Sequence, residues 1–272
     1  MLHKALWKQN FRKSGWLVGA LIALMWLFTT QPAINNMRNF TPEQLLFRDS
    51  EWGWTGLNPS MAGMFIVAFM SVALVSGERN KRELEQFLAF PFKRSDLFWA
   101  KWLFGAVSIF GAVLINSVAI SISFFQSPLS GFVGFTPFLH YFAFNFLFLL
   151  TVFTFGIMVG TLSKSVVSHL FFGAVGMVLL NVIGMFLIGI LWGARNHFLV
   201  SWLINFWVID IPNLSLISHL SYSLQLQYIN ETVHIFFESR SPWALVAYLT
   251  LSLLMSYRLF LKNLSRKDIK SS

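Results

Sequence analysis

The densest group of chemically versatile side chains lies in the stretch 76–101, where six Lys or Arg and four acidic residues interrupt an otherwise apolar chain. The part before Pro91 has strong helix formers and no internal Gly, so we predict a short helix that Pro91 ends. Leu84, Phe87 and Leu88 have the spacing i, i+3, i+4 and share one helix face. A short helix with an apolar knob and a charged rim suits docking into a groove on another protein.

Two features qualify this interpretation. After Pro91, Ser95 has the character of an N-cap and Asp96 suits the first turn of the next helix, so the segment is bounded by a second helix start. A basic loop between membrane spans is also a common topology signal, and an apolar stripe within it can lie on the lipid surface. The docking helix and the lipid-lying helix therefore remain alternatives at this point.

The residue types needed for catalysis or metal binding are missing or scattered. The chain has no Cys, no Walker-type Gly-x-x-x-x-Gly-Lys-Ser/Thr and no His-Glu-x-x-His. Its 11 acidic residues all fall outside the middle of the expected spans, whereas intramembrane enzymes and proton-coupled carriers normally place ionisable groups there. We therefore expect a non-catalytic chain that binds no metal or cofactor; ATP and Mg²⁺, if they power it, would be bound by another chain.

The composition places these residues in a membrane protein. The 272 residues are 56% hydrophobic and 11% charged, whereas a soluble domain has about a quarter charged residues. The net charge of +9 comes from basic residues next to apolar runs, a pattern that indicates topology rather than nucleic-acid binding. We expect an all-α integral membrane protein with a single transmembrane domain over 1–272. Its six expected spans are about 15–30, 59–76, 96–124, 138–162, 166–192 and 243–260.

The distribution of basic residues gives the orientation. With the N-terminus inside, 16 of the 20 Lys and Arg fall in inner segments and four in outer ones, so both termini are predicted to be cytoplasmic. The segment 1–14 alternates basic and apolar residues and is expected to be an amphipathic helix on the inner surface. The outer segment 198–211 is strongly apolar but too short to cross twice. We expect a re-entrant helix there, between spans 5 and 6; a flat interfacial helix is the alternative.

The charged segment resembles a known family. It is similar to the first cytoplasmic loop of ABC-2 type permeases. The shared order is a Glu at the end of a span, basic residues, Leu-Glu, a Leu, Pro, a basic residue, Ser, and then Lys entering the next span. One departure is the pair Arg82-Glu83, where many relatives have Gly-Thr or Gly-Ser. The matching positions are Glu78, Arg79, Arg82, Leu84, Glu85, Leu88, Pro91, Arg94, Ser95 and Lys101.

The resemblance implies a function and partners. It implies the membrane subunit of an ABC exporter in the cell membrane, with six spans, an N-terminal elbow helix, a separate ATPase and a second permease subunit, identical or related. The loop, here called the coupling helix, would seat in the ATPase. The residues expected to form this contact are Glu78, Arg82, Glu83, Leu84, Glu85, Phe87, Leu88 and Pro91.

The path and its cargo are inferred from composition. Neutral polar residues in apolar spans suit an amphiphilic or hydrophobic cargo, such as a peptide antibiotic, a lipid-like molecule or a drug. Asn116 in span 3 and Asn181 in span 5 are the candidates to line the path. A membrane-bound sensor or immunity protein that binds a ligand without transporting it is the main alternative. An intramembrane enzyme is disfavoured by the missing ionisable groups.

Overall fold

The computed structural model describes residues 2–31, 34–35, 59–75, 93–126, 136–163, 166–194, 199 and 242–269, and these form helices without any strand. The all-α class expected from the sequence is therefore confirmed for this part of the chain. The helices in chain order are α1 (Leu2–Met25), η1 (Trp26–Thr30), α4 (Pro59–Val75), α6 (Arg94–Phe125), α7 (Thr136–Leu162), α8 (Val166–Leu170), η5 (Phe171–Val175), α9 (Gly176–Gly193) and α13 (Pro242–Ile269).

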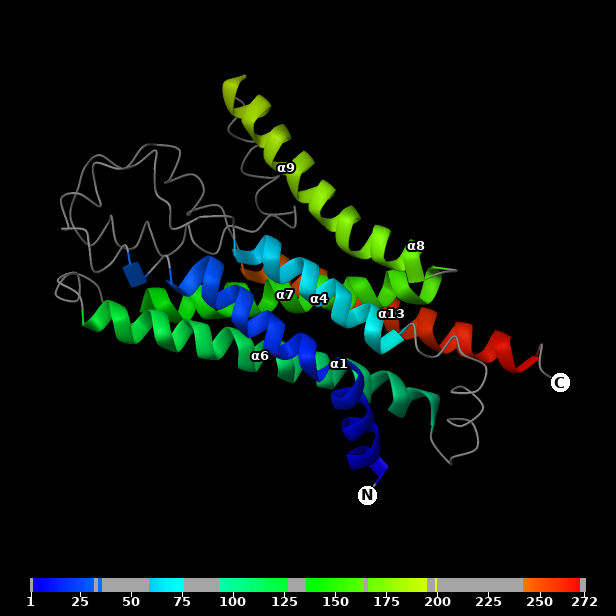
Figure 1. The fold of residues 1–272 in the computed structure, drawn as a ribbon. Coiled ribbons are helices and arrows are strands. Elements are labelled where there is room, and N and C mark those ends of the chain that lie inside the picture. The colour runs from blue at the N-terminus through cyan, green and yellow to red at the C-terminus, as the bar shows by residue number, and fades with distance from the viewer. Residues whose placement is uncertain are drawn as a thin grey trace.

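The long helices α1, α4, α6, α7 and α13 run side by side as a bundle (Figure 1). Helix α1 packs against α4 and α6, whereas α7 packs against α4, α6 and α13. The C-terminal ends of α4, α7 and α13 and the N-terminal ends of α1, α6 and α8 all lie toward the same end of the bundle (Figure 1). This end, here called the base, contains all the helix ends that the sequence assigns to the cytoplasmic side.

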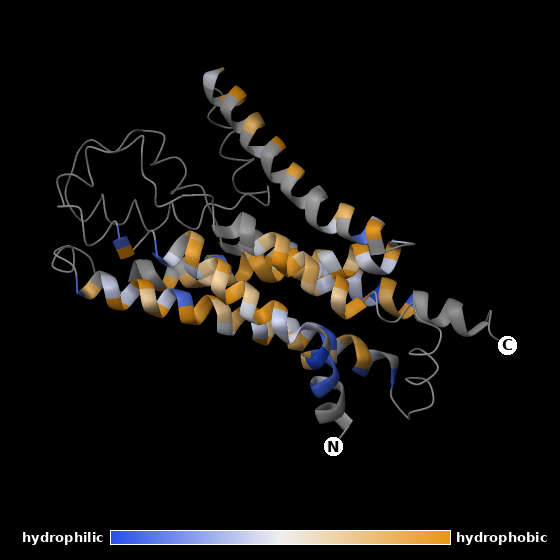
Figure 2. Ribbon diagram, in the orientation of Figure 1, coloured by the Kyte–Doolittle hydropathy of each residue, from blue (hydrophilic) through white to orange (hydrophobic). Residues whose placement is uncertain are grey.

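The bundle is held together by a continuous apolar core. Orange, hydrophobic segments occur along the helices of the bundle and along α9, whereas the largest group of blue segments lies near the N-terminal part of α1 (Figure 2). Large apolar side chains form such a core because their close contact supplies dispersion energy, which also stabilises helix packing in lipid. The largest fully buried side chains are Phe98, Phe148, Phe153, Leu21, Met64, Met70, Leu74, Ile109 and Ile120.

Two of the described helices are long and apolar enough to cross a membrane by length and composition, over Ser95–Ser123 and Asn145–Leu162. Shorter apolar helices cover Ser14–Phe28 and Gly63–Val75. Many large apolar side chains on the outside of the bundle are exposed, including Trp16 (70%) and Val167 (75%). An exposed apolar surface of this extent suits lipid or protein contact better than water.

The helices occupy the ranges that the sequence assigned to spans, with differences at their ends. Helix α1 begins at Leu2, so the expected inner-surface helix and the first span belong to one helix. Helix α13 continues to Ile269, beyond the expected span. Helix α6 begins at Arg94, so Ser95 lies in its first turn rather than at the N-cap position. The coupling helix and the expected re-entrant segment 198–211 fall almost wholly outside the described residues.

Helix α1 changes direction sharply between its first turns and the part that joins the bundle (Figure 1). Ser14 donates a hydrogen bond from Oγ to the carbonyl of Asn10 at 2.8 Å, and Gly15 follows directly. A serine that bonds back to the preceding turn bends a helix, and Gly–Ser pairs are frequent kink sites. The local sequence therefore accounts for a bend without proline.

The closest approach of α6 and α7 depends on one glycine. A Cβ on Gly105 would meet the ring of Phe153, with Cε2 at 2.8 Å, and the Phe153 side chain is fully buried. Gly111, on the same helix, has no atom within 4 Å of such a Cβ. The two glycines thus differ in packing while sharing a helical backbone.

We predict that Gly105→Ala lowers the free energy of unfolding by about 1–3 kcal/mol, because the added methyl forces the Phe153 ring out of its position. Gly111→Ala is the matched control and should be neutral or more stable by about 0.5–1 kcal/mol, as for alanine in an open helical position. Thermal unfolding of both purified variants in the same detergent provides the measurement. Equal midpoints for the two variants would contradict the close packing at Gly105.

Candidate functional site

The base of the bundle holds the two ends of the coupling helix segment. The expected contact residues, Glu78 to Pro91, lie outside the described residues, but the helices on either side are described: α4 ends at Val75 and α6 begins at Arg94. Asp96 in the first turn of α6 suits the positive end of that helix. The helix ends that surround this segment are described, and they are here called the frame.

Lys101 joins the two helices of this frame. Its side chain is only 6% exposed, and Nζ donates a hydrogen bond to the carbonyl oxygen of Leu74 near the C-terminal end of α4. The last four carbonyls of a helix have no partner within it, and a cation is favourable there because of the helix dipole. One buried lysine thus caps α4 from α6 and holds the entry and exit of the segment together.

Helix α1 is tied to the same place. Asn10, 6% exposed, donates from Nδ2 to the carbonyl of Ala100 at 3.2 Å. The rings of Trp7 and Phe104 meet edge to face with centroids 5.5 Å apart. Edge-to-face pairs add specific geometry to apolar burial. The carbonyl that Asn10 binds belongs to the residue just before Lys101, so α1, α4 and α6 are joined within one helical turn.

The C-terminal helix completes the frame through aromatic contacts. Phe98 is 1% exposed and its ring centroid lies 5.3 Å from Tyr257 and 5.5 Å from Phe260. Higher in the bundle, Trp102 Nε1 donates to Thr154 Oγ1 at 3.0 Å, and Ser256 Oγ donates to the carbonyl of Thr154 at 3.0 Å. The start of α6 is therefore fixed to α7 and α13 as well as to α1 and α4.

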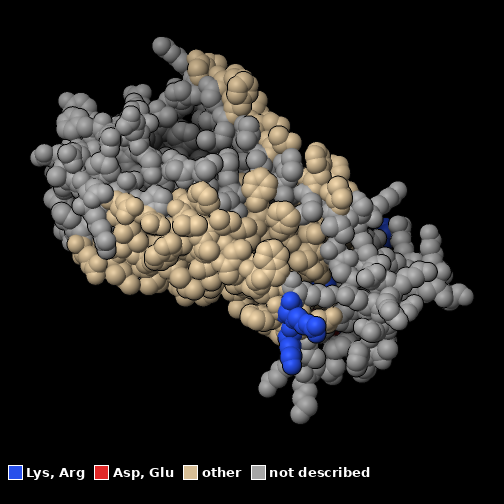
Figure 3. Space-filling view, in the orientation of Figure 1, with Lys and Arg blue, Asp and Glu red and all other residues tan. Residues whose placement is uncertain are grey.

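Basic side chains lie beside this frame. On the face shown in Figure 3, Lys and Arg gather at the end of the molecule where the N-terminus lies, and the rest of the described surface there is uncharged. Lys8 and Arg12 of α1 are exposed at this end. Positive charge at one end of an apolar bundle favours the cytoplasmic leaflet, whose lipids are anionic.

Of the two residues expected to line a path, only one has a side chain that the structure describes. Asn116 is 1% exposed; its Oδ1 accepts a hydrogen bond from Thr30 Oγ1 at 2.6 Å, and its Nδ2 donates to the carbonyl of Ala112 at 2.8 Å. In this structure the amide therefore joins α6 to η1. Asn181 lies in α9, and its side chain is outside the described part. A path role for either residue stays a prediction.

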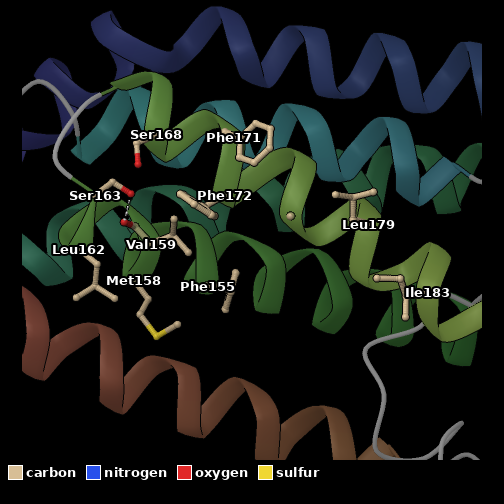
Figure 4. A pocket seen from close by; sticks show the side chains of 11 residues that line it. Phe155, Met158, Val159, Leu162, Ser163, Ser168, Phe171, Phe172, Leu179 and Ile183 are labelled. Atoms are coloured by element: carbon tan, nitrogen blue, oxygen red, sulfur yellow. Dashed lines mark hydrogen bonds between the residues drawn. The ribbon is translucent and has the colours of Figure 1, made fainter.

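A hollow of about 740 Å³ lies between the C-terminal half of α7 and the helices α8, η5 and α9 (Figure 4). Two hydroxyls, from Ser163 and Ser168, stand at one end, and the remainder is apolar (Figure 4). The sequence contains several glycines in this region but no pattern that reveals the hollow. Its other lining residues are Phe155, Met158, Val159, Leu162, Phe171, Phe172, Gly176, Leu179 and Ile183.

Within the described ranges, no group of three or more His, Cys, Asp or Glu is arranged to hold a metal ion. The buried polar side chains that are described are mostly hydroxyls and amides, with one lysine and one histidine, and most of them bond to their own helix or to a neighbouring one. Such an arrangement can transmit movement between helices and present an uncharged surface to a cargo.

We predict that Lys101→Met lowers the free energy of unfolding by about 1–3 kcal/mol, because the buried Leu74 carbonyl loses the Nζ donor while the apolar stem is retained. Lys8→Met removes the same charge from an exposed position of α1 and serves as the control. Thermal unfolding in detergent should separate the two variants. An equal, small change for both would show that the Lys101 contact contributes nothing to the frame.

Comparison with known proteins identifies the family of the chain. Residues 30–263 match the family described as ABC-2 family transporter protein. No curated protein is similar enough in sequence to match the chain. The family match covers far more than half of the 272 residues; it includes the helices from α4 to α9 in full and most of α13, whereas α1 precedes it. The chain therefore belongs to the ABC-2 family of transporter proteins and is a membrane-embedded ABC transporter permease.

Proposed function

We propose that this chain is the permease subunit of an ATP-driven exporter that moves an amphiphilic or hydrophobic cargo across the cytoplasmic membrane. A separate ATPase subunit supplies the energy, as ABC-2 permeases generally work with such a partner, and a second permease subunit completes the path. The observation that carries the proposal is the frame at the base, in which Lys101 joins both ends of the coupling helix segment.

The frame suits the transmission of force. The segment between α4 and α6 leaves and re-enters the bundle at helices joined through the Leu74 carbonyl, and Asn10 ties α1 to the same turn. A push on the segment by an ATPase would therefore move α1, α4 and α6 as one unit. Because Phe98 packs on α13, the movement would also reach the last helix.

The chemistry of the interior supports the class of cargo. Among the described helices, the buried polar groups are mainly neutral, and the hollow beside α7 is apolar with two serine hydroxyls. Such surfaces favour molecules with a large apolar part and few charges. The segment 198–211, proposed as a re-entrant helix, would roof the outer end of the path, where backbone must be covered by protein or face a water-filled cavity.

We predict a six-span topology with both termini and Lys164 in the cytoplasm, and with Asn39, Ser130 and Asn230 outside. The basis is the 16-to-four division of basic residues and the gathering of the expected inner helix ends at the base (Figure 1). Because the chain has no Cys, single Cys residues at these sites report accessibility to an impermeant thiol reagent. Labelling of the Lys164 site in intact cells would refute the topology.

We predict that Phe87→Asp releases the ATPase while membrane insertion stays normal. Removing one buried aromatic contact costs about 2–3 kcal/mol, or about 30- to 150-fold in affinity, and a buried charge adds to the loss. Gln86→Asp places the same charge next to it but off the apolar face, and is the control. Co-purification of the ATPase and cargo export are measured for both variants.

Two outcomes decide this prediction. Loss of the ATPase in the Phe87 variant, with retention in the Gln86 variant, would support a coupling helix seated in a groove. Normal recovery of the complex and normal export with Phe87→Asp would instead favour a helix that lies on the lipid surface.

A further inference from the structure

Helices α8, η5 and α9 follow one another without a break from Val166 to Gly193, but the middle segment, Phe171–Val175, is π-helical. A π-helical turn has the wider i→i+5 hydrogen bonding and occurs mostly as a local bulge, often at functional sites. Glycines stand inside it and directly after it, at Gly173 and Gly176. The fifth span therefore has a local irregularity between a short inner part and a long outer part.

The inner part is fixed by a buried histidine. His169 is 0% exposed, and its Nε2 lies 2.8 Å from the carbonyl oxygen of Gly156 on α7. Because a carbonyl can only accept, Nε2 carries the proton and donates. The same nitrogen lies 3.5 Å from Ser71 Oγ on α4, whose hydroxyl also donates to the carbonyl of Ala68 at 2.7 Å.

The His169 ring packs against α7 at Gly160, which has no side chain. A Cβ on Gly160 would meet the His169 ring, with Nε2 at 2.7 Å and Nδ1 at 2.8 Å. A Cβ on Gly156 would meet the side chain of Ser71, with Cβ at 2.9 Å. Helices α4, α7 and α8 thus approach one another at the imidazole, which both fills the space and donates a hydrogen bond.

The outer part of the fifth span, α9, is less closely packed than the inner part, α8. Beyond η5, α9 leans away from α7 and the rest of the bundle (Figure 1), and the hollow of about 740 Å³ lies on the side toward α7 (Figure 4). Large apolar side chains recur along α9 with high exposure: Leu179 (50%), Ile183 (49%), Phe186 (69%) and Ile190 (53%). The described contacts of α9 are thus sparse compared with those of α8.

We propose that His169 is a positioning residue that anchors the inner end of the fifth span to α4 and α7, and that η5 is the pivot about which α9 swings to change the width of the hollow. The anchor keeps the base of the bundle unchanged while the outer half moves. The inference concerns this chain's own helices and does not depend on the ATPase partnership proposed above.

Spin labels on exposed positions test the anchor and the pivot separately. One pair, Leu103 on α6 and Val167 on α8, reports the inner level; the other, Ile122 on α6 and Ile190 on α9, reports the outer level. All four side chains are at least 45% exposed, and the chain has no Cys that would compete for label. Distance distributions are measured by pulsed electron paramagnetic resonance on the full chain in lipid nanodiscs.

We expect a narrow distribution for the inner pair and a broad or two-peaked one for the outer pair. His169→Ala should broaden the inner pair, and His169→Gln should narrow it again because the amide can donate to the Gly156 carbonyl. Gly160→Ala should also broaden the inner pair by displacing the ring, but should have no further effect in the His169→Ala background. This dependence on background separates a seated ring from general loss of stability.

Three results would overturn the proposal. An outer pair as narrow as the inner pair in the unchanged chain would mean that η5 is not a pivot. An unchanged inner pair in the His169→Ala chain would remove the anchor. Equal effects of Gly160→Ala with and without the imidazole would show that the ring does not rest on Gly160. If His169→Ala does not fold, His169→Gln, which also lacks the ring, takes its place as the background in which Gly160→Ala is compared.

Discussion

The structure depends on one constraint: in an apolar surrounding, each polar group must find its hydrogen-bond partner within the protein. Most buried polar side chains of the described bundle meet this constraint in one of two ways, whereas Ser117 Oγ and His169 Nδ1 are buried without a hydrogen-bond partner. Many hydroxyls bond to a carbonyl of their own helix, as Thr151 does to Leu147 at 2.7 Å and Ser121 does to Ser117 at 2.8 Å. A few side chains reach another helix instead, and these few determine how the helices are arranged relative to one another.

The inter-helix bonds are distributed by level. At the base, Lys101 and Asn10 join the first three long helices. One residue farther along α6, Trp102 and Ser256 meet at Thr154 and join α6, α7 and α13. Farther along α6, Asn116 joins the end of the first span. In the movement proposed above, these bonds keep α1, α4, α6, α7 and α13 joined to one another while α9 swings.

Several features could be predicted from the sequence because they depend on composition alone. Apolar runs bounded by Pro and charged residues give the helices nearly at their observed ends, as at Pro59 and Pro242. The prediction that was wrong concerns a helix end, whose position depends on the neighbouring residues. Ser95 is a good N-cap by type, but α6 begins one residue before it, and cap positions are sensitive to the preceding turn.

The partners of polar residues were beyond the reach of a single sequence. Asn116 was identified as unusual, but its bond to Thr30 spans 86 positions, and no local pattern links the two. The π-helical segments likewise leave no clear periodicity. Lys101 was noticed only as part of the family motif, whereas its burial and its carbonyl partner on α4 are properties of the packed bundle.

The direction of these long-range bonds bears on how the protein is made. Three polar side chains that are costly to place in lipid bond backward in the chain: Lys101 to Leu74, Asn116 to Thr30 and His169 to Gly156. When each enters the membrane during synthesis, its partner has already been inserted. A ribosome working from the N-terminus thus delivers each of these three groups after its partner, so the order of translation itself limits the time that they spend exposed to hydrocarbon.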